Sequence, residues 1–218
     1  MKQLFELNKL SIAVLSKGNN PSILNKDFLI NNGIIPDSWE VTDVIITPPF
    51  SRIAYDNGVI FIVEEEKVTF ECISPEKIDW KSEIPRIASA YLSTLHHVQY
   101  HAIGHNFTII NKVESENLDK LIINELVKDG PWLNEFSGIS SSIINLSYKK
   151  TTPNVSIKIQ SAIKKTEKEA ETGIIVSANF HHDFHPGDID SETKYINSMP
   201  EYYEELITYI KTLPLINQ

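Results

Sequence analysis

The residues best suited to chemistry are the histidines, and all seven of them fall in two short stretches of the chain. Neutral imidazoles together with a carboxylate form a ligand set that suits zinc, or iron with open coordination positions. The two stretches supply six candidate metal ligands, which are His101, His105, His181, His182, Asp183 and His185.

The element that must position the first group is a predicted strand over residues 98–111. Side chains two residues apart share a face of a strand, so His101 and His105 are expected on one face, roughly 13 Å apart at about 3.3 Å per residue. One ion would therefore need a third group between them. Residues 181–185 could supply it if the predicted strand 174–182 lies beside strand 98–111. Gly104 predicts a bulge or the close approach of another group.

The alternative is that these histidines are placed by packing and take part in no reaction. In this interpretation His101 and His105 are hydrogen-bonded residues of a partly buried sheet, and residues 181–185 end a strand and begin a loop. We favour it because no helical His-Glu-x-x-His or other recognised ligand spacing accompanies the histidines. It predicts no cofactor, whereas the metal hypothesis predicts zinc or iron.

Other catalytic signatures are missing from the sequence. The single cysteine, Cys72, lies in an alternating apolar run, which predicts a buried side chain and excludes an internal disulfide or a thiolate cluster. There is no Gly-x-Ser-x-Gly motif and no glycine-rich nucleotide-binding loop. The eight glycines are scattered, so a phosphate-binding cradle is not expected.

Charge and composition narrow the classes of partner. The chain has 218 residues, 41% of them apolar, and its 29 acidic against 20 basic residues give a net charge of −9. Such a surface repels nucleic acid. No apolar run approaches the ~20 residues that cross a bilayer, and no signal peptide is recognisable. We therefore expect a cytoplasmic protein without membrane association.

One cluster of basic residues is present in this otherwise acidic chain. It predicts a solvated hairpin with interleaved glutamates, or alternatively a docking patch for an acidic partner. Its members are Lys149, Lys150, Lys158, Lys164, Lys165 and Lys168.

Hydrophobic periodicity predicts an α+β fold, with mostly antiparallel sheet packed on helices. Apolar residues at helical spacing indicate helices over 82–97, from 115 and over 198–212, and Asn57-Gly58 predicts a tight hairpin. The two halves share an order of strand, helix, several strands, helix. This predicts two tandem units, residues 1–97 and 98–218, while a single domain is the alternative.

Several of these segments also resemble a group of uncharacterised bacterial α+β proteins. The similarity is carried by the run from Thr47-Pro48-Pro49 to Val63, the helix ending near Tyr91-Leu92, a Y-x-x-x-G-x-N-F strand over residues 100–107, and the run Asn179 to Asp183. His105 departs from it, standing where an aliphatic residue is expected. The resemblance implies the fold and no established activity.

We therefore expect a non-catalytic protein that works by association, either as a homodimer or as a subunit of a larger assembly, such as a bacterial accessory or defence system. The alternative is a histidine-based metal-binding protein or metal-dependent hydrolase built on the six candidate ligands.

Overall fold

A computed structural model of the chain describes residues 5–113, 117–137, 139–149, 153–165 and 170–216. Nine strands and five α-helices are present in these ranges. The strands are β1 (Phe5–Lys17), β2 (Val41–Ile46), β3 (Phe50–Tyr55), β4 (Val59–Glu64), β5 (Lys67–Cys72), β6 (Gln99–Lys112), β7 (Ile143–Tyr148), β8 (Asn154–Lys165) and β9 (Ala170–Asp183). The helices are α1 (Lys26–Asn31), α2 (Trp80–Thr94), α3 (Leu118–Leu126), α4 (Ile189–Asn197) and α5 (Met199–Ile210).

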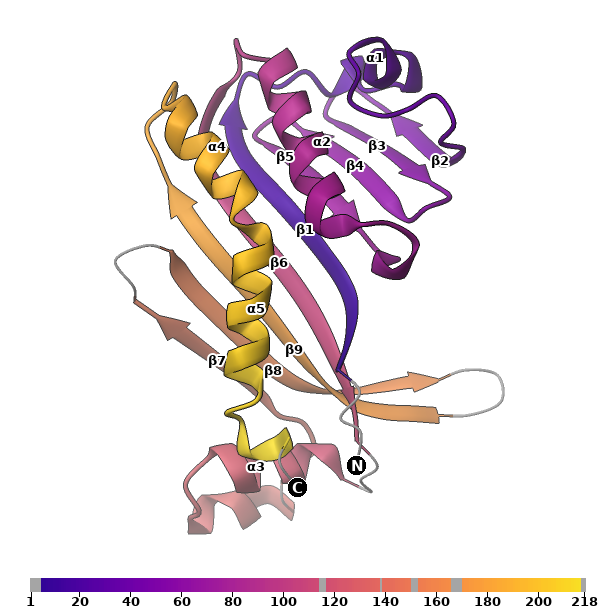
Figure 1. Cartoon of the computed structure of the whole chain (residues 1–218). Helices are drawn as coiled ribbons and strands as arrows, with labels where there is room; N and C mark the ends of the chain where they lie inside the picture. The colour runs from indigo at the N-terminus through magenta and orange to yellow at the C-terminus, as the bar shows by residue number, and fades with distance from the viewer. Residues whose placement is uncertain (1–4, 114–116, 138, 150–152, 166–169, 217–218) are drawn as a thin grey trace.

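All nine strands join one antiparallel sheet in the order β2-β3-β4-β5-β1-β6-β9-β8-β7, which confirms the predicted α+β class. The two halves of the chain repeat a topology. In each half the first strand pairs with the last, β1 with β5 and β6 with β9. The central pairing of β1 with β6 makes the sheet continuous (Figure 1).

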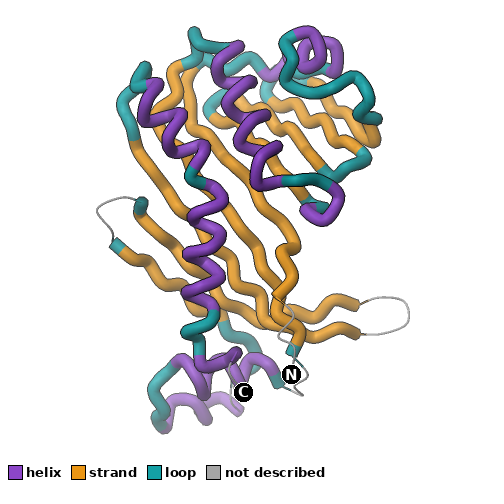
Figure 2. Tube along the Cα trace, in the orientation of Figure 1, coloured by secondary structure: helices purple, strands orange, loops and turns teal. Residues whose placement is uncertain are grey.

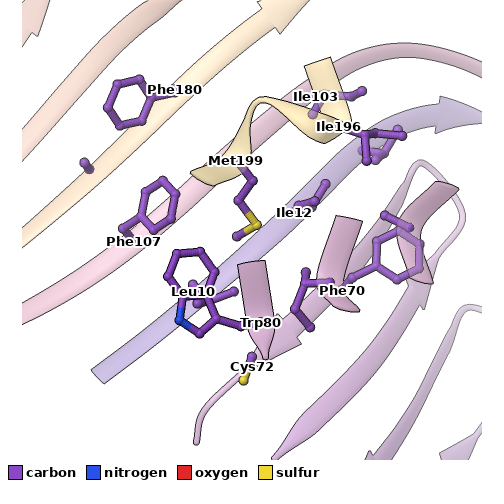
Figure 3. Close-up of a cluster of buried hydrophobic side chains, with 14 of the residues drawn as sticks. Leu10, Ile12, Phe70, Cys72, Trp80, Ile103, Phe107, Phe180, Ile196 and Met199 are labelled. Atoms are coloured by element: carbon purple, nitrogen blue, oxygen red, sulfur yellow. The ribbon is translucent and has the colours of Figure 1, made fainter. Parts of the chain in front are cut away.

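The helices α2, α4 and α5 cross the same face of this sheet, α2 over the N-terminal strands and the α4–α5 pair over the C-terminal ones (Figures 1 and 2). The hydrophobic core fills the space between the two layers. Figure 3 shows Trp80 from α2 and Met199 from the start of α5 beside Leu10, Ile12 and Phe107 of the sheet. On the opposite face of the sheet, the described part of the chain places no helix (Figure 2).

The C-terminal end holds one helix more than the predicted helix over 198–212. Residues 189–197 form α4, and Ser198 joins it directly to α5. Ser198 does not cap α5 with its side chain, because it has helical dihedrals and its hydroxyl donates back to the Lys194 carbonyl at 2.9 Å. None of the helices in the described ranges is long and apolar enough to cross a membrane.

On the open face of the sheet, polar side chains form a hydrogen-bonded row across the central strands. The Asn179 amide donates to Asn106 at 2.8 Å, and the Asn106 amide donates to Ser11 at 3.2 Å. Gly104 makes room for this row, since a Cβ there would lie 2.9 Å from the Asn179 amide nitrogen. The close approach predicted from Gly104 is therefore confirmed.

Candidate functional site

Strands β6 and β9 bring the two histidine groups beside each other, as the metal hypothesis required. In their antiparallel register His105 lies opposite Phe180, and His182 lies opposite Ile103. His105 and His182 therefore occupy neighbouring positions on the helix-covered face, beneath the α4–α5 pair.

His105 is completely buried in an aromatic environment. Its ring centroid lies 5.2 Å from that of Tyr202 and 6.3 Å from that of His182. Neither ring nitrogen of His105 meets a hydrogen-bond partner in the described part of the chain. Burial lowers the pKa of His105 to about 4, and the nearby His182 adds to the effect. The imidazole is thus neutral near pH 7.

His182 is 2% exposed and is fixed by two tyrosines. Its Nε2 lies 2.7 Å from the Tyr202 hydroxyl, and its ring stacks on Tyr195 with centroids 4.0 Å apart. Burial lowers the pKa of His182 to about 4, with smaller contributions from His181 and Lys194. A neutral phenol and a neutral imidazole can form this hydrogen bond with either group as the donor, so the contact requires a charge on neither of them.

His101 does not share a side with His105. The register between β1 and β6 shifts where Leu15 faces Ala102 and Ser16 faces Tyr100, so His101 is the extra residue of a bulge. It lines an open hollow of about 540 Å³ with Leu15, Lys17 and the β4–β5 turn. The prediction that His101 and His105 share one face is therefore wrong, because the bulge interrupts the alternation of side chains between them.

The remaining candidates lie away from the buried pair. His181 sits opposite Gly104 on the open face, and its Nε2 lies 3.1 Å from the exposed Asp183 carboxylate. His185 is exposed in the loop after β9. The six predicted ligands are thus divided among the interior, the open face and a loop.

This division bears on the metal hypothesis. Among the described residues, no three histidine, cysteine or carboxylate side chains come together as ligands for one ion. The two imidazoles that do meet, His105 and His182, would supply two ligands where a zinc site needs three or four from the protein. The arrangement fits packing with neutral rings better than it fits coordination.

A different feature, which the sequence did not single out, lies at the edge of the sheet. Strand β2 pairs with β3 only, and all six of its residues are exposed. Val44, Ile45 and Ile46 are 51%, 44% and 46% exposed. Alternation places Val44 and Ile46 on the helix side of the sheet and Ile45 on the open side.

The features that normally protect a sheet edge are weak on β2. Natural edge strands carry charges, especially lysine, or proline. The one charged side chain of β2, Asp43, is already neutralised by an ion pair with Arg52 on β3. Pro48 and Pro49 follow the strand without interrupting it. Val44 to Ile46 therefore present an uncharged aliphatic edge with free backbone groups.

The opposite edge of the sheet, β7, has a different character. Its exposed Ile143 is followed by Asn145 and Ser147, which alternate with the half-buried Ile144 and Leu146. This is the ordinary pattern of a strand with one packed and one wet face. A run of exposed aliphatic side chains on consecutive residues is thus a property of β2 and not of β7.

No protein-family model matches this chain, and no curated protein shows significant sequence similarity to it.

Proposed function

We propose that this protein is a non-catalytic association module, and that it binds a protein partner by adding a strand to the β2 edge. The observation that carries the proposal is that all six residues of β2 are exposed, among them three consecutive aliphatic residues, Val44 to Ile46. The neutral, enclosed state of His105 and His182 favours a structural role for the histidines over a catalytic one.

Strand addition explains both properties of this edge. Backbone groups on the outer side of an edge strand supply main-chain hydrogen bonds to an incoming strand. The aliphatic side chains then lose contact with water, at roughly 25 cal/mol per Å² of apolar area buried. An edge left permanently bare would instead be a site of uncontrolled aggregation.

The test is a charge placed on the edge. Val44→Lys puts an ammonium group at an exposed position, so we expect the fold to be retained and association to be lost. Ile143→Lys, on the opposite edge, is the matched control, since Ile143 is 55% exposed on a strand that is also at an edge.

The measurement is the mass of the purified full chain, together with the proteins that co-purify with it from its own cells. We expect the wild-type chain and Ile143→Lys to keep the same assembly and Val44→Lys to lose it. An assembly that survives Val44→Lys, or a wild-type chain that is monomeric and carries no stoichiometric partner, would contradict the proposal.

The metal hypothesis makes a competing prediction about the same protein. Chain purified without a polyhistidine tag would carry close to one equivalent of zinc or iron, and His105→Leu would remove it. Less than about half an equivalent in repeated metal analyses would dismiss this alternative, because a structural or catalytic site holds its ion stoichiometrically.

A further inference from the structure

A cavity of about 260 Å³ lies beside α5, at the end of the sheet opposite to β2. It is bounded by α5 and by the strands β7, β8 and β9. Its inner wall consists of Val155, Ile157, Phe180 and Leu206, and all four side chains are almost completely buried. The inner wall is therefore apolar and shielded from bulk solvent by the residues at the mouth.

The strand register explains why this wall is apolar. Tyr148 lies opposite Val155, and Val155 lies opposite Phe180. Phe180 in turn lies opposite His105, so all four side chains point to the helix-covered face. Because α5 packs mainly on β6 and β9, the apolar side chains of β7 and β8 extend past the helix and leave a cavity beside it.

Two tyrosines meet at the mouth of the cavity, Tyr148 from β7 and Tyr209 from α5. Their hydroxyl oxygens are 3.0 Å apart, and their rings meet edge to face with centroids 5.8 Å apart. One hydroxyl donates to the other, so the accepting tyrosine keeps its own O–H for a further acceptor. Burial and the hydrogen bond to Tyr148 raise the pKa of Tyr209, which keeps this phenol protonated. The mouth thus offers a neutral hydrogen-bond donor beside an apolar wall.

Lys149 adds a positive charge at the same mouth. Its side chain is exposed and forms no ion pair with the residues that the structure describes. Glu205, the acidic residue that lines the cavity, already interacts with another group. A cation and a phenol donor beside an apolar wall complement a carboxylate that is attached to an apolar body.

The volume of the cavity sets the size of such a ligand. Liquid water occupies about 30 Å³ per molecule, so 260 Å³ holds roughly nine groups of that size. Apolar cavities of about 150 Å³ take up benzene, and by proportion this cavity holds about ten non-hydrogen atoms. Both figures correspond to a carboxylate with an apolar body of about eight carbon atoms.

We propose that this cavity binds a small apolar carboxylate, an alkyl or aryl acid that places its apolar body against the inner wall and its carboxylate at Lys149 and the tyrosine pair. The apolar body contacts Val155, Ile157 and Leu206. The site is separate from the β2 edge and does not depend on the partner proposed there.

Calorimetric titration of the full chain with octanoate and with hydrocinnamate tests the site, and the tighter of the two acids distinguishes an alkyl from an aryl ligand. We expect one molecule of acid per chain. Lys149→Gln should weaken binding of the acid about fivefold or more, because it removes the charge that the carboxylate meets. Lys158→Gln is the matched control, since it removes the same charge from the open face of β8 and should leave the affinity unchanged. Octanol, which has no charge, should bind equally to the wild-type chain and to Lys149→Gln.

The methyl resonances of Val155, Ile157 and Leu206 locate the ligand without any substitution. We expect them to shift on saturation with the acid, while those of Ile143 on the open side of β7 stay in place. Equal weakening by Lys149→Gln and Lys158→Gln would overturn the proposal, because charge would then act only from a distance. Binding that leaves the three methyl groups unshifted, or the lack of saturable binding of either acid, would overturn it as well.

Discussion

Replacement of His105 by leucine should make the protein markedly more resistant to acid. His105 is fully buried and neither of its ring nitrogens has a hydrogen-bond partner among the described residues. Leucine has a similar volume and no polar atoms, so the exchange at neutral pH removes two buried ring nitrogens that lack a hydrogen-bond partner and costs the two ring contacts with Tyr202 and His182. The unfolding free energy of the variant at pH 7.5 should lie within about 1 kcal/mol of wild type.

The magnitude follows from the pKa of His105, which is 6.5 unperturbed and about 4 in the folded chain. Because the folded pKa is lowered, the unfolded chain binds more protons. The contribution of the neutral His105 to the free energy of unfolding is therefore fully present above pH 6.5 and is lost as the pH falls toward 4. At about 1.4 kcal/mol per pKa unit, this one group costs roughly 2 kcal/mol at pH 5 and roughly 3 kcal/mol at its limit.

Urea unfolding at several pH values between 7.5 and 5 measures this difference directly. The wild-type chain should lose about 2 kcal/mol more than His105→Leu over that range. His182 also titrates with a pKa lowered to about 4, so the variant keeps part of the acid dependence. Parallel pH profiles for the two proteins, or a folded-state His105 resonance titrating near 6.5, would refute the packing argument.

Three further substitutions test other parts of the structure by the same unfolding assay. Gly104→Ala should cost about 1–2 kcal/mol, because its Cβ displaces the Asn179 amide, and Asn179→Ala in the same chain should recover part of the loss. Trp80→Ala should cost about 3–5 kcal/mol, since it empties the contact between α2 and the core, and a cost below about 1 kcal/mol would contradict the packing in Figure 3. Asp119→Ala should cost about 1–3 kcal/mol, because its carboxylate accepts from both the backbone N–H and the hydroxyl of Ser142; an unchanged midpoint would show that this link does not stabilise α3.

Hydrophobic periodicity and turn residues were enough to predict most of the helices and strands. The predicted helix over 82–97 appears as α2, the strand over 98–111 appears as β6, and the Asn57-Gly58 turn joins β3 to β4 with Gly58 at φ 84°. Local signals suffice for such elements because one face is apolar or because one residue type fits the backbone. The tip of the lysine hairpin, which was predicted to be solvated, lies outside the described residues.

The site was less accessible to sequence reasoning, for physical reasons. A bulge at His101 moves one side chain to the other face. Gly104 offered a bulge as one of two alternatives, but no residue in the run marks His101 as its position. The exposure of Val44 to Ile46 depends on strand order, since the same residues in a central strand would be buried. Whether a strand lies at the edge depends on the tertiary fold, and the residue pattern of β2 does not indicate it.

Hydrogen–deuterium exchange of the β2 amides, measured against protein concentration, tests the central claim most directly. The N–H groups of Val44 and Ile46 point away from β3, because Thr47 and Phe50 form a hydrogen-bonded pair and bonded pairs alternate along the ladder. They are unprotected in a monomer and bonded once a strand is added. We expect their exchange to slow at least tenfold from low to high micromolar concentration or when the co-purified partner is bound, while the Ile143 amide of β7 does not change. Exchange at Val44 and Ile46 that is independent of concentration and of any co-purified protein would contradict it.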